Sequence, residues 1–433
     1  MKISVIGCGY LGTVHAACMT ELGHDVVGID VDAAKIELLA AGRPPFFEPG
    51  LPEMLTSAMA TGRLSFRTDI AAVEGAQVHF IAVGTPQLGD SFAADLTFVD
   101  AAVEAIVPHL RPGDLVVGKS TVPVGTAARL AEVVRESGAS LAWNPEFLRE
   151  GFAVKDTLAP DRLVYGIESD DSSAEALLDA VYATALAAGT PKVVTDFATA
   201  ELVKVAANAF LATKISFINA MAEVAEATGA DVTQLADAIG YDARIGRRFL
   251  NAGLGFGGGC LPKDIRGFMA RAEELGVDQA LSFLREVDSI NLRRRERMVD
   301  LAAEVVGGAV AGKRIAILGL AFKPDSDDVR DSPALDVAQR LGELGALVVA
   351  TDPEAVETSR RRHPELAYVS SPEEAVRGAD AVLLLTEWKQ YRELDPGALG
   401  SLVAHRAIVD GRNCLDPVAW RKAGWHYRAL GRP

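Results

Sequence analysis

A glycine-rich turn near the N-terminus restricts the possible fold of this chain more than any other feature. Residues 7–12 read Gly-Cys-Gly-Tyr-Leu-Gly and directly follow the apolar run Lys2–Ile6. In a strand–turn–helix unit, Gly7 permits the tight turn, Gly9 lets the backbone approach a pyrophosphate, and Gly12 lets the helix pack closely on the strand. We therefore predict a strand at Lys2–Ile6, a dinucleotide-binding turn, and a helix from about Tyr10 to Leu22.

An acidic residue at the end of the next predicted strand indicates which dinucleotide binds. The run His24–Asp30 reads as a second apolar strand, and Asp30 lies 18 residues after Gly12. A carboxylate at this position accepts a hydrogen bond from a ribose 2′-hydroxyl and repels a 2′-phosphate. The pattern predicts NAD rather than NADP.

Strands and helices alternate in two separate parts of the chain. The predicted fold class is therefore α/β, with two doubly wound Rossmann-like domains joined by a long central helical region. We expect an NAD-binding domain at residues 1–196, a central helical dimerisation domain at 197–306 that carries the reactive cysteine loop, and a second Rossmann-like domain at 307–433. Further strands are predicted at Val78–Gly84, Leu115–Lys119, Ser140–Trp143, Lys313–Gly319, Ala346–Asp352, Ala379–Leu385 and Ala407–Asp410.

The central region reads as two long helices. Residues 197–228 contain no glycine or proline, Asp196 is a good N-cap, and Gly229 is a good stop signal. A second helix is predicted from about Gln279 to Val306, and we expect its run of charges, Arg293–Arg297, to form a solvated face. An amphipathic helix of this length needs a partner face, so we expect a homodimer or a larger homo-oligomer.

Composition excludes several classes of protein. The 433 residues carry a formal net charge of −16, which argues against a general binder of nucleic acid or anionic membranes. Four scattered cysteines form no disulfide framework or zinc motif, so we expect no metal and a cytoplasmic location. The uncharged run Ile3–Thr20 imitates a signal peptide, but its glycines and His15 fit the nucleotide turn better. No later run reaches the ~18 apolar residues of a membrane span.

The most reactive residue in the sequence follows a glycine run. Residues 253–264 read GLGFGGGCLPKD. Such a loop can press its backbone against a ligand, and Pro262 is typical of the first turn of a helix. A thiol at a helix N-terminus beside Lys263 should be activated as a nucleophile, so Cys260 is our candidate nucleophile.

A cation and an amide are expected to accompany this thiol. Lys204 and Asn208 are four residues apart on the first long helix and therefore share a face, where they could stabilise a developing oxyanion. Asp264 lies at the same helix start as Cys260 and could orient a base or a water.

Polar residues also follow several predicted strands, at the edge where ligands bind in doubly wound folds. They include Thr85, the run Ser120–Pro123 and the run Asn144–Gly151; for Ser120 and Gly151, turn and cap duties are equally plausible. In the last domain, Lys323 and Arg330 would suit phosphate or carboxylate oxygens. At least two of Asp327, Asp328 and Asp331 are expected to cap helices.

Together these motifs resemble the nucleotide-sugar dehydrogenases of the UDP-glucose/GDP-mannose dehydrogenase family, and the UDP-glucose 6-dehydrogenase type among them. The resemblance runs from Met1 to about Asp416. It rests on the Lys204/Asn208 pair and on GCGYLG (7–12), STVPVGT (120–126), NPEFLREG (144–151), GLGFGGGCLPKD (253–264), GLAFKPDSDDVRDSP (319–333), TEWKQYRELD (386–395) and DGRN (410–413). One departure is Gly259, where many members have serine; glycine there should preserve the turn.

The resemblance implies a four-electron oxidation of the C6 alcohol of UDP-glucose to the carboxylate of UDP-glucuronate, with two NAD. It implies that Cys260 forms a thiohemiacetal and then a thioester, that Lys204 and Asn208 stabilise oxyanions, and that Asp264, Glu146 and Thr121 serve the acid–base and water steps. The implied NAD contacts are Gly7, Gly9, Tyr10, Leu11, Gly12, Asp30, Lys35, Thr85, Thr121, Glu150, Lys263 and Arg330. The implied sugar-nucleotide contacts are Glu146, Phe147, Leu148, Arg149, Glu150, Lys204, Asn208, Phe249, Leu250, Asn251, Ala252, Gly253, Gly257 and Lys323, with Arg244 reaching a neighbouring subunit's substrate.

Three alternatives remain open from the sequence. Related family members oxidise GDP-mannose or UDP-N-acetylhexosamines, although the relatives acting on UDP-N-acetylmannosamine usually lack the lysine found at Lys263. A two-electron 3-hydroxyacid dehydrogenase can share the glycine turn and the Lys/Asn pair but would not need Cys260. A catalytically silent NAD-binding regulator would not need the intact set. The NADH yield per substrate, two, one or none, separates these classes.

Overall fold

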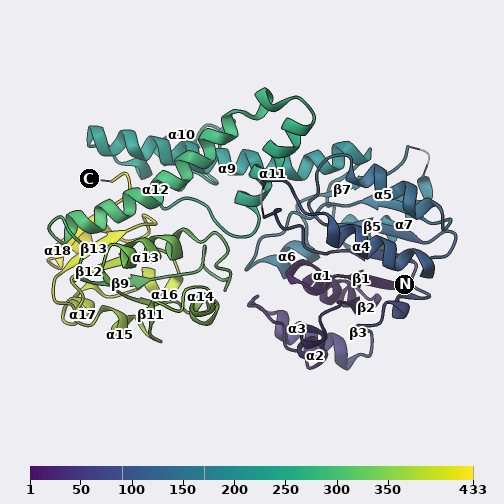
Figure 1. Cartoon of the computed structure of the whole chain (residues 1–433), viewed down its shortest axis with the longest axis horizontal. Coiled ribbons are helices and arrows are strands. Elements are labelled where there is room, and N and C mark those ends of the chain that lie inside the picture. The colour runs from purple at the N-terminus through teal and green to yellow at the C-terminus, as the bar shows by residue number, and fades with distance from the viewer. Residues whose placement is uncertain (90, 170, 433) are drawn as a thin grey trace. The chain divides into compact units, whose positions relative to one another are not determined.

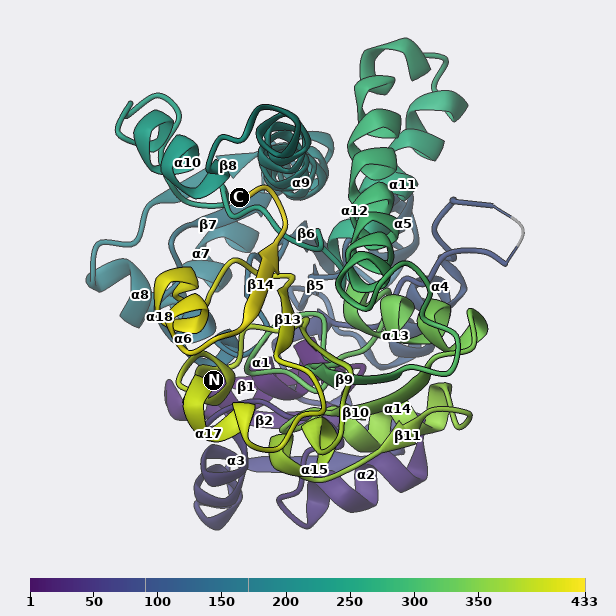
Figure 2. The same cartoon turned by 90° about the vertical axis from the view of Figure 1, so that its left-hand side faces the viewer.

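The computed structural model describes residues 1–89, 91–169 and 171–432. They form two compact units, Met1–Ala207 with Arg266–Gly276, and Asn208–Ile265 with Val277–Pro433. Helices α9 (Phe197–Thr228) and α11 (Leu261–Glu274) each contribute residues to both units. Each unit has a sheet of its own (Figures 1 and 2).

The sheet of the first unit has the strand order of a Rossmann fold with two strands added. Its order is β3-β2-β1-β4-β5-β6-β7-β8, and every neighbouring pair is parallel except β6 with β7. The order reverses between β1 and β4, which is the switch point where such sheets bind ligands. The strands are β1 (Lys2–Ile6), β2 (Asp25–Ile29), β3 (Leu64–Arg67), β4 (Val78–Ile81), β5 (Leu115–Gly118), β6 (Ser140–Trp143), β7 (Leu163–Gly166) and β8 (Lys192–Thr195).

Helices cover both faces of this sheet. Within β5, Leu115 and Val117 belong to one apolar core while Val116 belongs to the other, as the alternation of side chains along a strand requires. The first core receives α1, α2, α3, α6 and α7, and the second receives α4, α5 and the start of α9. The helices are α1 (Tyr10–Glu21), α2 (Ala33–Ala40), α3 (Leu51–Ala60), α4 (Thr97–Ile106), α5 (Thr126–Arg135), α6 (Ala153–Leu158), α7 (Ser172–Val181) and α8 (Ala183–Ala187), with short 3₁₀ turns η1 (Ile70–Val73) and η2 (Val107–His109).

The second unit repeats the same strand order in a smaller sheet. Its six strands run β11-β10-β9-β12-β13-β14, all parallel, so the switch point lies between β9 and β12. The strands are β9 (Arg314–Leu318), β10 (Leu347–Thr351), β11 (Ala367–Tyr368), β12 (Ala381–Leu384), β13 (Ala407–Asp410) and β14 (His426–Ala429).

The other elements of the second unit are helical. A small core of its own joins α9 to α10 (Val232–Gly240) through Ile218, Ala222 and Val232. Helix α12 (Phe283–Val305), preceded by the 3₁₀ turn η3 (Asp278–Leu281), packs on the sheet core through Met298 and Leu301. The shorter helices are α13 (Pro333–Glu343), α14 (Val356–Arg362), α15 (Pro372–Val376), α16 (Lys389–Arg392), α17 (Pro396–Gly400) and α18 (Pro417–Lys422).

The predicted fold class is confirmed, and each predicted strand contains an observed one. The long helix also begins and ends where the sequence places it: the Asp196 carboxylate accepts the Thr199 N–H at 2.8 Å, and Gly229 has φ +75°. Five strands, β3, β7, β8, β11 and β14, were not predicted.

One expectation about α12 is wrong. The run Arg293–Arg297 is not simply a solvated face, because Arg294 and Arg295 are buried. The Arg294 guanidinium donates to Glu226 of α9 at 2.9 Å, and Arg295 donates to Asp331 at 2.8 Å. Paired carboxylates at distant sequence positions make this burial possible.

Helix α9 also differs from the expectation that no later run is long and apolar enough to span a membrane. Among the described residues it is the single helix long and apolar enough to cross a membrane. Of its most apolar 18-residue window, 44% is buried inside the protein, and a core helix passes the same test. Its buried polar residues Ser216 and Asn219 donate to or accept from neighbouring backbone groups, as in a core helix.

Candidate active site

The glycine turn of the first unit has the geometry that a pyrophosphate site requires. Gly7 has φ +92°, a conformation that favours glycine. A Cβ atom at Gly12 would lie 1.8 Å from the Gly7 carbonyl oxygen, whereas one at Gly9 would meet no atom within 4 Å. The first and third glycines are therefore needed for packing, and the backbone at the second stands open, directly before α1. These residues fit a dinucleotide.

Asp30 lies beside this turn, as expected. One carboxylate oxygen accepts the Cys8 N–H and the Lys35 ammonium, both at 2.8 Å, and the other accepts the Asp32 N–H at 3.0 Å. The structure thus brings Asp30 and Lys35 together at the end of β2. The arrangement fixes the carboxylate at the position that contacts the ribose in Rossmann folds.

A buried carboxylate that was not predicted links the turn to the segment 144–151. Glu48 is 2% exposed and accepts the N–H groups of Gly151 at 2.6 Å and Ala153 at 2.7 Å. It also accepts the Tyr10 hydroxyl. Burial, followed by these contacts with Glu48, raises the pKa of Tyr10, so the phenol stays protonated. A charged residue in the apolar stretch Phe46-Phe47-Glu48-Pro49 is the sequence signal that could have identified it.

The acid–base candidates of the first unit form a buried pair. The Lys204 ammonium donates to Glu146 at 2.9 Å, and the two side chains are 6% and 13% exposed. The other Glu146 oxygen accepts the Leu148 N–H at 2.7 Å. The Phe147 ring lies under both the Arg162 guanidinium, at 3.7 Å, and the Lys204 ammonium, at 5.7 Å. An ammonium and a carboxylate held in this way can exchange a proton with a hydroxyl placed beside them.

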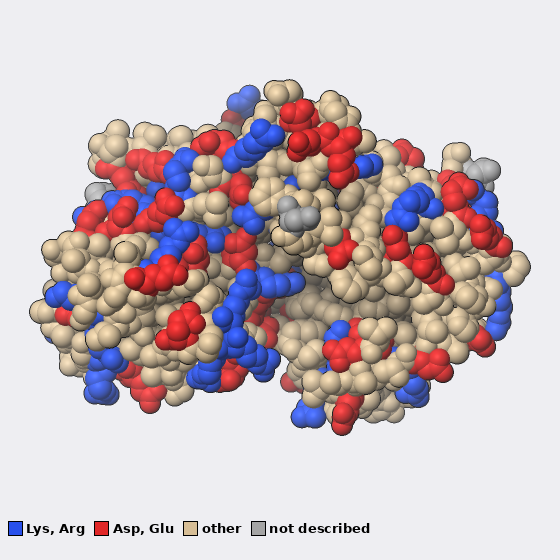
Figure 3. All heavy atoms as spheres, in the orientation of Figure 1, with Lys and Arg blue, Asp and Glu red and all other residues tan. Residues whose placement is uncertain are grey.

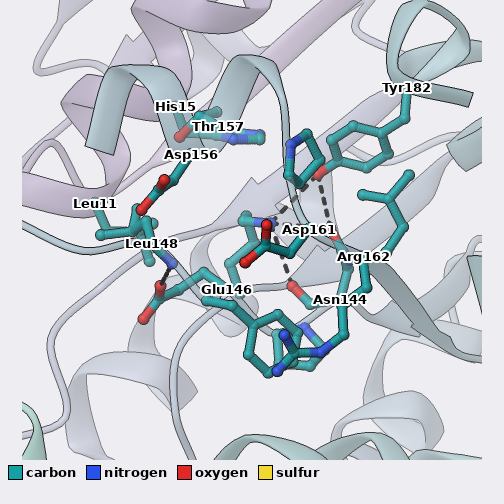
Figure 4. Close-up of a pocket in the computed structure, with 15 residues that line it drawn as sticks. Leu11, His15, Asn144, Glu146, Leu148, Asp156, Thr157, Asp161, Arg162 and Tyr182 are labelled. Carbon is teal, nitrogen blue, oxygen red and sulfur yellow. Dashed lines mark hydrogen bonds between the residues drawn. The ribbon is translucent and has the colours of Figure 1, made fainter. Parts of the chain in front are cut away.

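A cavity of about 60 Å³ opens beside Glu146 (Figure 4). Leu11, Asn144, Glu146, Phe147 and Leu148 line it, together with residues that were not predicted, namely His15, Lys119, Asp161, Arg162 and Tyr182. Its wall therefore includes both charged and apolar side chains. The unpredicted residues named here come from four separate segments, and no local motif connects them.

The other predicted site residues that follow strands of the first unit make different kinds of contact. The Thr85 hydroxyl donates to the Thr121 carbonyl at 2.8 Å, which brings these two candidates together. Ser120 donates to the Val83 carbonyl and so has a turn duty. Arg149 is held by Asp156 through two N–H···O bonds, of 2.8 and 2.7 Å, and Glu150 is buried.

Another unpredicted residue supports the loop that carries Thr121. Glu201 of α9 is 2% exposed, and its carboxylate accepts the N–H groups of Gly125 at 2.8 Å and Ala127 at 2.7 Å. These are donors at the start of α5 that would otherwise lack a partner. Glu201 therefore fixes the end of the segment that follows Thr121.

In the second unit, Cys260 is the residue immediately before α11. Its carbonyl accepts the Asp264 N–H at 2.8 Å, which closes the first turn of the helix. Asp264 is buried and accepts the Asn208 amide at 2.6 Å and the Lys263 ammonium at 2.7 Å. The structure thus joins Asn208, Lys263 and Asp264 at the helix start that carries the thiol. Lys204 belongs to the first unit and Asn208 to the second.

The glycine loop before Cys260 is clamped by side chains that were not predicted as site residues. Asn291 of α12 bonds the N–H and carbonyl of Phe256, at 2.7 and 2.9 Å. Asn219 of α9 accepts the Gly253 N–H at 2.9 Å. Arg412, which follows β13, donates to the Gly255 carbonyl at 3.0 Å and to the Phe322 carbonyl at 3.1 Å. The loop is therefore fixed to the switch-point edge of the second sheet.

Close packing explains several glycines of this loop. A Cβ atom at Gly257 would lie 2.3 Å from the Asp331 carbonyl oxygen. At Gly259 it would lie 2.3 Å from the Arg330 guanidinium, so Arg330 occupies the space that a serine side chain would need. Upstream, Phe249 has φ +66°, a left-handed conformation that is strained for a residue with a Cβ.

The second sheet has a strand-end aspartate, but its carboxylate is used by the protein itself. Asp352 follows β10, and one oxygen accepts the N–H groups of Leu320 and Ala321 and the Trp388 indole, at 2.7, 3.0 and 3.1 Å.

The acidic run after β9 has roles other than helix capping. Ser332 caps α13, while Asp328 binds the Arg330 guanidinium at 2.7–3.0 Å and Asp331 binds Arg295. The expectation that at least two of these aspartates cap helices is therefore wrong. The Arg330 side chain is 58% exposed, and its charge is partly balanced by Asp328.

Arg244 lies on the loop after α10, where its side chain is 90% exposed and pairs with Asp242 at 2.7 Å. Both units carry acidic and basic side chains intermixed over the face shown in Figure 3. Among the described residues, no group of three or more His, Cys, Asp or Glu side chains is placed to hold a metal ion.

Comparison with known proteins agrees with this geometry. Residues 1–186, 198–293 and 316–417 match the NAD binding, central and UDP binding domains of the UDP-glucose/GDP-mannose dehydrogenase family. The chain is 42% identical to the UDP-glucose 6-dehydrogenase of Rhizobium meliloti, with all of both chains covered.

Solved structures give the same result. A UDP-glucose dehydrogenase from Pyrobaculum islandicum is 41% identical, with a TM-score of 0.90 over 100% of this chain and 98% of that one. A UDP-D-ManNAc dehydrogenase from Pyrococcus horikoshii is 27% identical, with a TM-score of 0.87 over 100% and 99%. The chain belongs to the UDP-glucose/GDP-mannose dehydrogenase family.

Proposed function

We propose that this chain oxidises the C6 alcohol of UDP-glucose to the carboxylate of UDP-glucuronate, using two NAD per sugar. The observation that carries the proposal is the start of α11, where Cys260 precedes a buried Asp264 that binds both Asn208 and Lys263. A two-electron dehydrogenase has no need of a thiol there. The R. meliloti and P. islandicum relatives, both about 40% identical, support UDP-glucose as the substrate.

The first unit would hold NAD. Gly7, Gly9 and Gly12, with Tyr10 and Leu11, would receive the pyrophosphate at the start of α1, and Asp30 with Lys35 would bind the adenosine ribose. Further contacts would come from Thr85, Thr121, Glu150, Lys263 and Arg330. NAD, when bound, supplies the acceptor for a hydride from C6 of the sugar. Asp30 makes NAD the expected cofactor rather than NADP.

Glu146, Lys204 and Asp264 would serve the proton-transfer steps. Glu146 accepts the proton of the C6 hydroxyl, directly or through a water held with Thr121, and the Lys204 ammonium stabilises the negative charge that develops on oxygen. Asn208 donates a second hydrogen bond to the same oxyanion, and Asp264 orients the Asn208 amide. This division of roles is supported by the 2.9 Å contact of Lys204 with Glu146 and the 2.6 Å contact of Asn208 with Asp264.

Cys260 would retain the aldehyde that the first oxidation produces. Its thiolate adds to the aldehyde carbon to give a thiohemiacetal, which is oxidised to a thioester, and water then replaces the sulfur to give the carboxylate. The adduct keeps a reactive aldehyde bound between the two oxidations. Serine would be a poor substitute because its alkoxide is scarcely populated near neutral pH.

The sugar nucleotide would lie against the glycine loop and the segment 146–150. Its contacts would include Glu146, Phe147, Leu148, Arg149, Glu150, Lys204, Asn208, Phe249, Leu250, Asn251, Ala252, Gly253, Gly257 and Lys323. We propose corresponding domains at residues 1–196 for NAD, 197–306 for dimerisation and the cysteine loop, and 307–433 for the UDP group. The clamping of the loop by Arg412 and Asn291 supports a rigid binding wall.

We also propose a homodimer that forms through α9, in the cytoplasm. Phe210, Phe217 and Val224 repeat every seven residues on this helix and are 67%, 48% and 54% exposed. Large apolar side chains in such a stripe are typical of helix–helix interfaces. The exposed Arg244 would reach the substrate of the neighbouring subunit.

A panel of sugar nucleotides tests the substrate. NADH formation is followed with UDP-glucose, UDP-GlcNAc, UDP-ManNAc and GDP-mannose at equal concentrations. We expect kcat/KM to be highest for UDP-glucose, by at least about tenfold. A higher kcat/KM for any of the other three would refute the substrate assignment and leave the family assignment intact.

A further inference from the structure

Lys119 is a buried cation that the proposed chemistry does not use. It directly follows β5 in the first unit and is 6% exposed. Its ammonium donates to the Asn144 side-chain oxygen at 2.9 Å, to the Asn144 carbonyl at 3.3 Å and to the Tyr182 hydroxyl at 3.3 Å. Figure 4 shows Asn144 and Tyr182 converging on this point of the cavity wall.

These bonds anchor the start of the segment that carries Glu146. Asn144 is two residues before Glu146, and it is also held by its amide, which donates to the Val164 carbonyl at 2.9 Å, and by its N–H, which donates to Gly118 at 2.8 Å. Tyr182 donates to the Asn144 side-chain oxygen at 2.7 Å. Among the described contacts of Asn144, only the bonds from the Lys119 ammonium have a charged donor.

Lys119 also interacts electrostatically with the catalytic pair. Burial lowers the pKa of Lys119 to about 8, while the charge of Glu146 opposes this shift and the charge of Lys204 adds to it. One carboxylate thus lies within the fields of two ammonium groups in a site that largely excludes water, where charges interact strongly.

The other ionisable groups around the cavity come from several elements. His15 of α1 faces Lys119, and burial, with the charge of Lys119, lowers the pKa of His15 well below its ordinary value, so His15 adds no charge. Tyr182 follows α7, and burial raises its pKa, so it is neutral as well. Asp156, Asp161 and Arg162 complete the charged lining. Asp156 is already bound by Arg149.

We propose that Lys119 is a positioning residue for the Glu146–Lys204 pair, which it serves by fixing Asn144 at the base of the Glu146 segment. The inference rests on the proposed role of Glu146 as the proton acceptor. A lysine that only filled the interior would support the fold and leave kcat of the folded protein unchanged.

Separate measurement of kcat and KM for UDP-glucose distinguishes these roles. Lys119→Met removes the ammonium and its hydrogen bonds, and Lys119→Gln keeps a donor for Asn144. Because a misplaced proton acceptor slows the chemical step, we expect kcat of Lys119→Met to fall by about tenfold or more while KM changes by less than about twofold. Lys119→Gln should recover most of the lost kcat. The matched control is Tyr182→Phe, which removes a neutral donor to the same Asn144 oxygen and should lower kcat less than Lys119→Met does.

The outcomes separate this inference from the proposed function. Glu146→Gln should lower kcat by about a hundredfold or more, and a wild-type kcat in this variant would show that the proposed role of Glu146 is wrong. If Glu146→Gln loses activity but Lys119→Met keeps the wild-type kcat, the inference about Lys119 is overturned alone. An equal loss of kcat in Lys119→Met and Lys119→Gln also counts against the inference, because the second variant keeps the donor. Circular dichroism checks that each variant is folded, and Asn144→Ala, which removes the same bond from the other side, is measured if Lys119→Met does not fold.

Discussion

At the scale of single residues, Cys260 is where the proposed four-electron chemistry differs from an ordinary dehydrogenase. Cys260→Ser barely changes the volume at the head of α11, so we expect a folded protein. Formation of UDP-glucuronate should fall by about a thousandfold or more, because a hydroxyl is a far weaker nucleophile than a thiolate. Product is quantified by mass spectrometry, which also detects any ester trapped on the protein. Cys414→Ser, at a half-buried cysteine, is the control and should retain activity.

The burial of Lys119 leads to a second prediction, which concerns how the free energy of unfolding depends on pH. Its pKa falls from an ordinary 10.5 to about 8, chiefly through burial. Below pH 8 its buried charge therefore costs about 3 kcal/mol of folding free energy. Between about pH 8 and 10.5 the folded protein has released this proton while the unfolded chain still binds it, so stability from this group rises with pH.

Denaturant unfolding of the wild type and Lys119→Met across this range measures the effect. The free energy of unfolding of the wild type should rise relative to the variant as the pH goes from 8 to 10.5. A constant difference between the two proteins over this range would show that Lys119 does not titrate in this way.

At the scale of elements, the glycine loop depends on space that only glycine leaves. Gly255 has φ +91°, and a Cβ atom there would lie 2.0 Å from the Asn291 side-chain oxygen that holds Phe256. Gly255→Ala should lower the free energy of unfolding by about 2 kcal/mol or more and reduce kcat/KM for UDP-glucose.

Gly246 provides the matched control for this substitution. It has φ +69°, and a Cβ atom there would meet nothing within 4 Å. Gly246→Ala has the left-handed strain without the clash and should cost only about 1 kcal/mol. Equal losses for the two variants, measured by urea unfolding, would show that the Asn291 clamp contributes nothing.

Comparison of the predicted and observed elements shows which of them the sequence could predict. The ends of α9 follow from local signals, Asp196 and Gly229, and the glycine turn carries its geometry in six consecutive residues. Strand β8, half-exposed with the sequence Lys-Val-Val-Thr, has only two apolar residues and was missed. Burial of Arg294 and Arg295 depends on Glu226 and Asp331, which are 68 and 36 residues away in sequence, so periodicity could not reveal it.

The candidate site likewise contains some residues that the sequence identifies and others that it does not. Cys260, Lys204, Asn208, Asp264 and Asp30 lie in motifs whose residue types state their chemistry. The residues that support them, including Glu48, Lys119, Asn291 and Arg412, act through tertiary contacts at sequence separations of 25 to 157. Arg412 lies in the DGRN motif, but no local pattern marks the supporting role of these residues, which became identifiable only when the fold placed them.

At the scale of the whole molecule, the exposed stripe on α9 predicts the oligomeric state. Phe210→Asp combined with Phe217→Asp would place two charges in a proposed apolar interface, where unpaired carboxylates are costly. Sedimentation should show a dimer or larger assembly for the wild type and a monomer for the double variant. Val418→Asp, at a side chain that is 71% exposed on α18, should not change the assembly. A wild type that is monomeric and active would contradict the dimer.

The most direct test of the proposed activity is the number of NADH molecules formed per molecule of sugar nucleotide. UDP-glucose is supplied in limiting amount with excess NAD, the reaction runs to completion, and NADH is read by absorbance while the sugar product is identified by mass spectrometry. We predict two NADH for each UDP-glucose consumed and a uronate as the product. A yield of one, with the aldehyde as product, or a yield of none would contradict the four-electron oxidation through Cys260.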